Sequence, residues 1–567
     1  MDHAATATAT AHLDTFARDR LPPPAAQPEF VFELPELQFP ARLNCAAELL
    51  DRRIAQGWGA RRCLIAPDGT VWTYAELHRQ SNRIAHVLVN DMGLVPGNRV
   101  LLRAANSPQL AACWFAVIKA GGIAVGTMPM LRAKELVQII DKAQVTHALC
   151  DAALADELAL AAVAAPVLRE VCHFGRLAEG GLEARAARQP DHFATVDTAA
   201  DDVCLLAFTS GTTGQPKATM HFHRDLMAAC ACFPPHVLRA TADDVFIGSP
   251  PLAFTFGLGG LLLFPMQVGA ATVLLAKTTP PDLLEGIARH GATVLFTAPT
   301  SYRAMAATAG QRRVAAAQGG TLRRCVSAGE ALPAATRTLW REATGIELID
   351  GIGATELLHI FISADEQHAR PGATGLAIPG YRACVLDEHL QPVPTGTVGR
   401  LAVKGPTGCR YLDDPRQAQY VQGGWNLTGD AYLQDADGFF VYQSRTDDMI
   451  VSAGYNIAAP EVEEALLRHP DVAECAVIGI ADDERGQIVK AFVVLKPGAV
   501  GVAGAAGAAG VAGVAGVAGD QACIQALQDF VKAGIAPYKY PRVIEFRDAL
   551  PRTETGKLQR FRLRGGP

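Results

Sequence analysis

The stretch that organises this sequence is Thr209-Ser210-Gly211-Thr212-Thr213-Gly214-Gln215-Pro216-Lys217, a loop rich in hydroxyls and glycine. It follows the short apolar run 203–208, which predicts a buried strand. In such a loop glycines let backbone N–H groups approach a ligand, hydroxyls donate hydrogen bonds, and a lysine adds positive charge. The stretch therefore predicts a polyphosphate site, with a plain polar surface turn as the alternative. It is not a Walker loop, because Lys217 follows Pro216 and not the second glycine.

Composition limits the classes of protein that the chain fits. At 567 residues it is long enough for several domains, and its net charge of −6 leaves no basic surface for nucleic acid or an anionic membrane. The thirteen cysteines include no CxxC pair, and no secretory signal opens the sequence, so we expect reduced thiols in a cytoplasmic protein. The uncharged stretch 245–276 is broken by prolines and glycines, which predicts buried core and not a membrane span.

Predicted helices and strands alternate along most of the chain. A hairpin over 61–71, turning at Asp68-Gly69, precedes a helix that begins after Thr73 with Glu76 three residues on. Further strands are predicted over 99–103, 123–125 and 146–150, and helices over 108–120 and 134–143. This alternation predicts an α/β protein whose parallel-rich sheets are covered by helices. Later strands within 287–299, 322–330 and 346–356 end in small or acidic residues, where ligands of open α/β sheets gather.

The two ends of the chain differ from this body. Residues 1–11 are mostly small and predicted to be disordered, and the following segment to residue 40 predicts an extended arm. Beyond residues 445–448, helices over 460–468 and 525–533 and strands over 473–480 and 490–495 predict a compact α+β unit. The Gly/Ala/Val repeats at 499–519 predict a flexible surface loop, with elastin-like self-association as the alternative. We therefore expect a large N-terminal domain over 1–446 and a small, mobile C-terminal domain over 447–567.

Four side chains that could bind a metal follow the loop, namely His221, His223, Cys230 and Cys232. Their spacing matches no common zinc site, and the segment predicts an amphipathic helix. We therefore expect no metal here.

Several segments, in order along nearly the whole chain, resemble the adenylate-forming superfamily of acyl- and aryl-CoA ligases, luciferases and peptide-synthetase adenylation domains. The loop at 209–217 resembles the phosphate loop of that family, and Gly351-Ile352-Gly353-Ala354-Thr355-Glu356 resembles its adenine and magnesium segment. Thr428-Gly429-Asp430 resembles the ribose segment. Each motif is weak alone, but their common order is specific. The resemblance implies an enzyme that uses ATP and Mg²⁺ to make an acyl-AMP and pyrophosphate, then transfers the acyl group to coenzyme A.

The resemblance also implies a role for individual residues. ATP would contact Thr209, Ser210, Gly211, Thr212, Thr213, Gly214, Lys217, Ser327, Ala328, Gly329, Glu330, Asp350, Gly351, Ile352, Thr355, Asp430 and Arg445. Thr355 would meet the α-phosphate and Glu356 would hold Mg²⁺, which prefers few carboxylates together with phosphate oxygens. Asp430 could accept hydrogen bonds from both ribose hydroxyls. The tail ending Thr555-Gly556-Lys557 resembles the last motif of the family, whose lysine stabilises charge on the reacting carboxylate and the α-phosphate.

Transfer to the thiol involves the C-terminal part of the chain. By the same resemblance Asp447 is the hinge about which the small domain rotates between the two half-reactions. The tunnel for coenzyme A would be lined by Ser452, Ala453, Gly454 and Tyr455. Many relatives carry glycine where Ala453 stands, which makes this wall bulkier. No covalent nucleophile is needed, and the sequence contains no GxSxG elbow.

The acid substrate is suggested by two stretches. Residues 351–362 (GIGATELLHIFI) resemble benzoate-type aryl-CoA ligases, and residues 251–257 (PLAFTFG) put an aromatic where many fatty acyl ligases carry histidine. The implied pocket contains Phe254, Thr255, Phe256, Ala328, Gly353, His359 and Ile360. Phe254 would be a platform for a flat ring, with plain core packing as the alternative. Residues 14–44 are most similar to 2-aminobenzoate–CoA ligases, which implies that substrate.

Three other functions are compatible with these motifs. The first is the same reaction on benzoate or a hydroxybenzoate, and the second is a stand-alone adenylation protein that loads a carrier-protein thiol. The third is a nucleotide-binding sensor without catalysis, against which Glu356, Asp430 and Lys557 argue. The expected partners are an aromatic acid, ATP and coenzyme A, without nucleic acid or membrane. The sequence does not set the oligomeric state.

Overall fold

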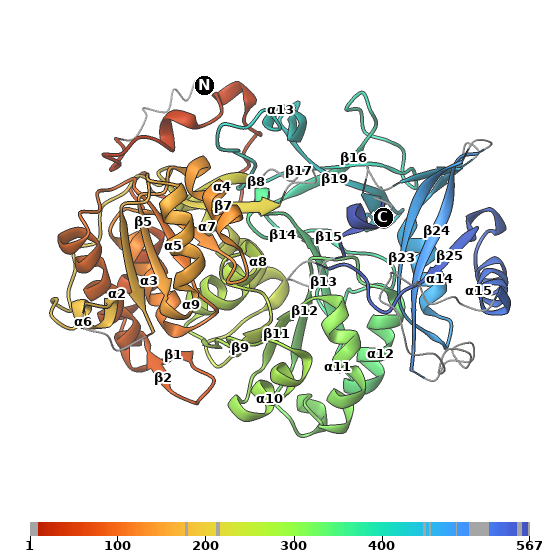
Figure 1. Cartoon of the computed structure of the whole chain (residues 1–567), viewed down its shortest axis with the longest axis horizontal. Coiled ribbons are helices and arrows are strands. Elements are labelled where there is room, and N and C mark those ends of the chain that lie inside the picture. Colours follow the sequence, from red (N-terminus) through yellow and green to blue (C-terminus); the bar gives the residue numbers. More distant parts are fainter. Residues whose placement is uncertain are drawn as a thin grey trace.

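The computed structural model describes residues 9–175, 180–210, 216–445, 449–452, 455–482, 485–497, 521–552 and 558–564. Within these residues the strands form four sheets, and helices pack between and around them (Figure 1). The predicted α/β class, with a large N-terminal part rich in sheets and a smaller α+β part at the C-terminus, is confirmed. The proposed boundary and the hinge residue Asp447 fall on residues 446–448, outside the described residues, as does the Gly/Ala/Val stretch 499–519.

The first sheet has the strand order β6-β5-β3-β4-β7-β8. Its strands are β3 (Arg99–Arg103), β4 (Ile123–Thr127), β5 (His147–Asp151), β6 (Glu170–Phe174), β7 (Val203–Ser210) and β8 (Pro216–Phe222). All neighbours are parallel except β7 and β8, which run antiparallel on either side of residues 211–215. The associated helices are α2 (Tyr74–His86), α3 (Pro108–Lys119), α4 (Ala133–Ala143), α5 (Ala155–Ala164), α6 (Leu182–Ala186) and α7 (His223–Phe233). The first of these begins at the predicted capping box of Thr73 and Glu76.

The second sheet has nine strands in the order β15-β14-β13-β12-β11-β9-β10-β1-β2. They are β1 (Arg62–Ile65), β2 (Val71–Thr73), β9 (Val245–Gly248), β10 (Ala271–Val273), β11 (Val294–Thr297), β12 (Arg324–Ser327), β13 (Leu348–Gly353), β14 (Ile360–Ser363) and β15 (Leu376–Ala377). The centre is parallel and both edges are antiparallel. Its helices are α8 (Thr255–Leu258), α9 (Phe264–Val268), α10 (Pro280–His290), α11 (Pro299–Gln311) and α12 (Ala334–Thr344). The carboxyl ends of the parallel strands therefore share one edge.

The third sheet is antiparallel and lies beside the N-terminal arm. It contains β16 (Arg382–Leu386), β17 (Gly399–Lys404), β18 (Val421–Gln422), β19 (Trp425–Gln434) and β20 (Phe440–Arg445), with α13 (Gln417–Tyr420) before β18. The predicted arm crosses to this sheet, because the Val31 N–H donates to the carbonyl oxygen of Gly405 at 3.0 Å. The expectation of disorder is wrong for residues 9–11, since the backbone N–H of Ala11 donates to the carboxylate of Asp202 at 2.9 Å.

The C-terminal part has its own sheet and apolar core, drawn in blue at one end of the molecule in Figure 1. The strands are β21 (Ile450–Ser452), β22 (Tyr455–Ile457), β23 (Val472–Asp482), β24 (Gly486–Leu495) and β25 (Val543–Phe546). The helices are α14 (Ala459–Leu467), α15 (Gln521–Gly534) and α16 (Arg560–Arg564). Because α12 of the larger part contacts α14, the two parts are packed against each other here.

Two expectations about apolar segments have different outcomes. The stretch 245–276 is buried core as predicted, and among the described residues no helix is long and apolar enough to cross a membrane. The prediction of an amphipathic helix in the segment from His221 to Cys232 is confirmed for the helix α7, but it is wrong in two respects. His221 belongs to β8, where pairing with β7 continues the strand, and α7 is buried on nearly all sides by the segments that pack around it.

Candidate active site

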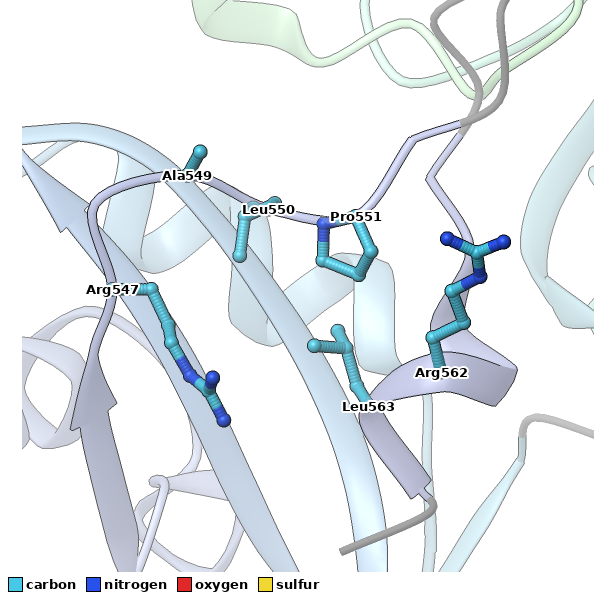
Figure 2. Close-up of a pocket in the computed structure, with 6 residues that line it drawn as sticks. All are labelled: Arg547, Ala549, Leu550, Pro551, Arg562 and Leu563. Carbon is cyan, nitrogen blue, oxygen red and sulfur yellow. The ribbon is translucent and has the colours of Figure 1, made fainter. Parts of the chain in front are cut away.

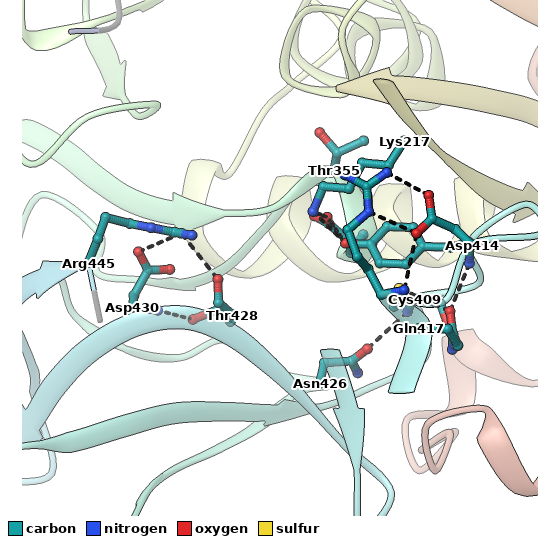
Figure 3. Close-up of polar contacts among 12 residues, drawn as sticks. Lys217, Thr355, Cys409, Asp414, Gln417, Asn426, Thr428, Asp430 and Arg445 are labelled. Carbon is teal, nitrogen blue, oxygen red and sulfur yellow. Dashed lines mark hydrogen bonds and ion pairs between the residues drawn. The ribbon is translucent and has the colours of Figure 1, made fainter. Parts of the chain in front are cut away.

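A cluster of polar groups surrounds Lys217 on β8. Its Nζ lies 2.8 Å from Oε1 of Glu356 and 2.6 Å from the hydroxyl of Tyr411. The Tyr411 hydroxyl also donates to the same Glu356 oxygen. Figure 3 shows this group of contacts around Lys217 and Thr355. Tyr411 was not predicted, because it lies in a loop without a recognisable motif and reaches the cluster only through the fold.

The carboxylate of Glu356 is ionised although it is buried. Burial raises its pKa, but the charge and hydrogen bond of Lys217 and the hydrogen bond from Tyr411 outweigh burial, so the pKa lies below its ordinary value. A single buried carboxylate with a neighbouring lysine fits a Mg²⁺–phosphate complex, because Mg²⁺ takes few protein carboxylates and fills its other positions with water and phosphate oxygens. Lys217 compensates the negative charge of the Glu356 carboxylate.

A buried histidine holds the backbone next to this cluster. Nε2 of His221 lies 2.8 Å from the carbonyl oxygen of Thr355, so the ring donates to that oxygen. On the other side its Nδ1 lies 3.8 Å from the carboxylate of Asp225, which pairs with Arg410 at 2.7 Å. These side chains are all buried. This chain of contacts therefore fixes the position of Thr355. The sequence did not predict this role for His221, Asp225 and Arg410.

The ends of three parallel strands bring the predicted base-binding residues together. The register places Thr297 of β11 beside Ser327 of β12, and Ser327 beside Asp350 of β13. Ala328 and Gly329 follow directly, and Gly351 and Ile352 continue β13. Thr297, which was not predicted, exchanges a hydrogen bond of 2.6 Å with Ser249. The edge therefore offers hydroxyls and a carboxyl group at one place.

Asp350 differs from Glu356 in its protonation. Burial raises the pKa of Asp350 to about 7, and the positive charge of Arg337 lowers it only in part. The group is therefore partly protonated near neutral pH. A carboxyl group in this state can donate as well as accept a hydrogen bond.

A second polar group lies apart from the Lys217 cluster in Figure 3. Asp430 of β19 faces Arg445 of β20 in the hairpin register, with Oδ1 and Nη1 3.1 Å apart. Arg445 also donates to the carbonyl oxygen of Thr428 at 3.2 Å. Gly429 has a φ of 77°, and a Cβ there would lie 2.8 Å from the Arg445 guanidinium, so glycine is required. The two residues predicted for the ribose are thus adjacent.

The C-terminal tail meets the strand edge at Glu330. Arg552 lies 3.3 Å from Oε1 of Glu330, and the backbone N–H of Leu558 donates to the same oxygen at 3.1 Å. These two residues flank the segment 553–557. The segment itself, with Lys557, lies outside the described residues, as do Gly211, Thr212, Thr213, Gly214, Ala453 and Gly454. Of the predicted tunnel residues, Ser452 pairs with Tyr455 across β21 and β22.

His359 lies in a box of four phenylalanines. Its ring centre is 4.5 Å from that of Phe264, 5.5 Å from Phe256, 5.7 Å from Phe233 and 6.4 Å from Phe296. Burial lowers the pKa of His359 to about 3, so the imidazole is neutral. Neither ring nitrogen makes a well-formed hydrogen bond to a described residue, but the backbone of Phe256 lies close enough to oppose the effect of burial on the pKa in part. The box is apolar except for these two nitrogens.

The other predicted pocket residues surround this box unevenly. Phe254 is half-buried at the start of α8, Thr255 and Ile360 are buried, and Ala328 is 4% exposed. Gly353 does not open a slot on its Cβ side, since a Cβ there would lie 2.8 Å from the backbone of His359. The small residue at 353 is therefore explained by a close backbone approach.

The turn between β13 and β14 is strained. Leu358 has φ 71° and ψ −45°, and the His359 N–H donates to the Leu357 carbonyl oxygen at 2.9 Å. These values describe a γ-turn of the rare kind, which costs about 1–3 kcal/mol. The strained turn sets His359 against the four rings while Thr355 and Glu356 stay beside Lys217.

A hollow in the C-terminal part is separate from these groups. It measures about 410 Å³ and is lined by Arg547, Ala549, Leu550, Pro551, Arg562 and Leu563. Figure 2 shows Leu550, Pro551 and Leu563 between the two arginines. The described residues that line this hollow include none of the predicted site residues.

Comparison with known proteins agrees with this arrangement. Residues 51–410 match the AMP-binding enzyme family, and residues 461–557 match the AMP-binding enzyme C-terminal domain. The chain is 34% identical over 534 residues to a benzoate–CoA ligase of Thauera aromatica, covering 94% of this chain and 97% of that protein. It is 31% identical to a 4-hydroxybenzoate–CoA/benzoate–CoA ligase of Rhodopseudomonas palustris, covering 92% and 94%.

Two solved structures are similar over nearly their whole length. One is the anthranilate CoA ligase AuaEII in complex with anthranoyl-AMP, with a TM-score of 0.85, 32% identity and coverage of 94% of this chain and 98% of that one. The other is a benzoate CoA ligase from Burkholderia xenovorans LB400, with a TM-score of 0.81, 30% identity and coverage of 92% and 100%.

Proposed function

This chain belongs to the AMP-binding enzyme family, and we propose that within this family it activates 2-aminobenzoate. It is an AMP-forming acid–CoA ligase for aromatic acids, with ATP and coenzyme A as co-substrates. The resulting reaction joins the carboxylate to the α-phosphate of ATP, releases pyrophosphate, and then exchanges AMP for the thiol of coenzyme A.

The observation that carries the choice of 2-aminobenzoate is the box around His359. The phenylalanines around His359 would favour a flat apolar ring beside them, and the neutral imidazole has two nitrogens without a well-formed hydrogen bond within the described parts of the chain. Benzoate would leave both nitrogens unpaired. A substrate with one small polar substituent, such as an amino group, would pair one of them. The similarity to the structure of an anthranilate CoA ligase supports the same choice.

Activation of the carboxylate is proposed to use the Lys217 cluster. Glu356 would hold Mg²⁺, which would neutralise charge on the phosphates when bound. Lys217 would then turn from Glu356 to a phosphate oxygen, since it lies at the start of β8, next to residues 211–215 of the loop. Thr355 would contact the α-phosphate from the position fixed by His221. Asp430 and Arg445 would hold the ribose, and Lys557 would stabilise the reacting carboxylate.

Thioester formation is proposed to follow a rotation of the C-terminal domain about Asp447. Ser452, Ala453, Gly454 and Tyr455 would then line the path of the pantetheine arm. The division into domains over 1–446 and 447–567 belongs to this proposal. The contacts of Arg552 and Leu558 with Glu330 support a role of the tail in activation of the acid.

The test is pyrophosphate release by the purified enzyme with a panel of acids, with and without coenzyme A. We expect kcat/KM for 2-aminobenzoate to exceed that for benzoate by about 10–200-fold, as for one polar contact. Equal or better use of benzoate or 4-hydroxybenzoate would contradict the assignment of the acid. Release of pyrophosphate without consumption of coenzyme A would instead indicate a carrier-protein acceptor.

A further inference from the structure

Three side chains that bind soft metal ions meet in the interior near β7 and β8. Cys45 opens the helical segment that continues into η4 (Ala47–Asp51), Cys204 lies on β7, and His223 opens α7. One ligand atom from each lies within 4.8 Å of the other two. All three residues are at most 1% exposed. Segments far apart in the sequence therefore place two thiols and an imidazole at one buried point.

The imidazole already presents a lone pair to this point. The backbone N–H of Cys45 donates to Nδ1 of His223 at 3.2 Å, so this nitrogen carries no proton. The same nitrogen lies 3.3 Å from the sulfur of Cys45. A metal ion binds the lone pair of a ring nitrogen, so it would replace the Cys45 N–H as the partner of Nδ1.

The two cysteines would bind a metal ion through their sulfur atoms. These atoms lie within 4.8 Å of each other and of a ring nitrogen of His223. Cysteine binds metal as the thiolate, so both sulfurs would face the ion in that form.

We propose that Cys45, Cys204 and His223 form a structural site for a thiophilic divalent cation, Zn²⁺. Both thiols give up their protons to solvent on binding, so two thiolates and one neutral imidazole compensate the double positive charge. The resulting complex is neutral, as a fully buried site requires. Cu⁺ on the same ligands would leave one negative charge in the interior. Mg²⁺ and Ca²⁺ would find no oxygen ligand in this set.

A further buried donor lies close by. His12 is 5% exposed, and its Nε2 has no hydrogen-bond partner among the described residues. The neighbouring Ala11 is bound to the Asp202 carboxylate at 2.9 Å, and the backbone N–H of His223 donates to the Asp202 carbonyl oxygen at 3.3 Å. Structural zinc sites take four ligands. His12 does not belong to the set of ligand atoms within 4.8 Å of one another, so it would supply the fourth only after moving toward the other three.

The site would connect the N-terminal segment to the hairpin of β7 and β8. Cys204 lies on the first strand of that hairpin and His223 directly follows the second. The expectation of no metal concerned His221, Cys230 and Cys232 with His223, and only His223 of those four belongs to the present set. A metal here would tie together the strands that flank residues 211–215, without touching the reacting groups.

The test starts with the metal content of the full-length protein, produced with zinc and purified under reducing conditions without chelator. We expect about one Zn²⁺ per chain, as for a single structural site. Cys45→Ala and Cys204→Ala should lose it, whereas Cys113→Ala, which removes a buried cysteine outside the set, should retain it. Loss of zinc in all three variants alike would overturn the proposal.

A second measurement does not depend on the folding of any variant. The wild-type protein is unfolded, reduced, and refolded with Co²⁺, which absorbs strongly in the near ultraviolet when thiolates bind it. Appearance of that band, and its loss on adding Zn²⁺, would support the site. A refolded, active enzyme that shows no band and retains neither metal would overturn it. A disulfide between Cys45 and Cys204 in peptide mapping of the freshly purified protein would also overturn it.

Discussion

The Lys217 cluster and the His359 box lie at the two ends of one short turn. Among the described residues, the buried polar groups have well-formed hydrogen bonds in the cluster but not in the box. At one end Glu356 is fully paired, with Lys217 and Tyr411 compensating its charge. At the other end, the nitrogens of His359 make no well-formed hydrogen bond to the described residues and have only a weak contact with the backbone of Phe256; a buried group left unpaired costs about 1–3 kcal/mol. The paired cluster is stable before its ligand arrives, whereas the box gains its missing contact only from a ligand. The first would serve a reaction common to all acids, and the second would select one acid.

The largest effect is expected for the paired cluster. Lys217→Met leaves the buried Glu356 carboxylate without its charge partner and removes a charge aimed at the phosphates. We expect acid-dependent pyrophosphate release to fall about 100–1,000-fold, as for loss of one preorganised donor. The free energy of unfolding should fall by about 3 kcal/mol, because an unpaired charge stays buried.

A double variant separates these two effects. Lys217→Met with Glu356→Gln removes both charges, so stability should recover toward the wild-type value while activity stays low. Urea unfolding and pyrophosphate release measure the two quantities. If the double variant is no more stable than Lys217→Met, the ion pair does not stabilise this end of the turn.

A substitution of Asp350 tests whether burial alone sets the protonation state of a carboxyl group, or whether a charged partner is also needed. Its folded pKa of about 7 lies above the unfolded value of 3.8, so its stabilising contribution is present below about pH 4 and is lost as the pH rises through 7. As the pH rises from about 4 to 7, the free energy of unfolding of Asp350→Asn should therefore increase relative to that of wild type, by an amount on the order of 3 kcal/mol. Urea unfolding at several pH values checks it. A difference between the two proteins that does not change with pH would contradict the assignment.

His221 is expected to act through Thr355, as a positioning residue. His221→Phe removes the donor to the Thr355 carbonyl oxygen, so the α-phosphate contact should be misplaced and kcat should fall about 10–100-fold. The KM for the aryl acid should change little, because the His359 box is untouched. His221→Asn, which keeps a donor, should recover part of kcat. A parallel rise in KM for every substrate would indicate general damage.

The sequence predicted what local patterns determine. The capping box at Thr73 and Glu76 and the strand β3 over 99–103 follow from short-range signals, and the structure contains both. The pair of Asp430 and Arg445 followed from resemblance, and the hairpin register of β19 and β20 explains why they meet. The parallel register at Ser327 and Asp350 likewise follows from strand ends that share an edge.

The missed features depend on contacts between distant segments. Tyr411 lies 194 residues from Lys217, and Cys45 lies 178 residues from His223, so no spacing rule connects them. His221 was placed on a helix, because the pattern of its segment does not reveal that pairing with β7 extends β8 through Phe222. The small residue at Gly353 was attributed to a pocket, whereas a backbone approach explains it. The roles of Lys557, Asp447 and residues 211–215 of the phosphate loop stay predictions, since those residues lie outside the described parts.

A substitution of His359 should have the smallest effect on stability. The pH dependence of this effect should be opposite to that expected for Asp350. The folded pKa of His359, about 3, lies below the ordinary 6.5, so its stabilising contribution is present above pH 6.5 and is lost as the pH falls toward 3. His359→Phe should abolish this acid sensitivity. At pH 7 it should leave stability unchanged or raise it by about 1 kcal/mol, since an unpaired polar group is removed. Urea unfolding at both pH values would measure this.

The most direct test of the account is the ratio of kcat/KM for 2-aminobenzoate to that for benzoate, measured in wild type and in His359→Phe. In wild type we expect a ratio of about 10–200, because one polar contact to the imidazole separates the two acids. In the variant the ratio should fall close to one, through loss of 2-aminobenzoate turnover and with benzoate turnover largely kept. A ratio near one in wild type, or a high ratio that the substitution leaves unchanged, would contradict the claim that the unpaired histidine selects the acid.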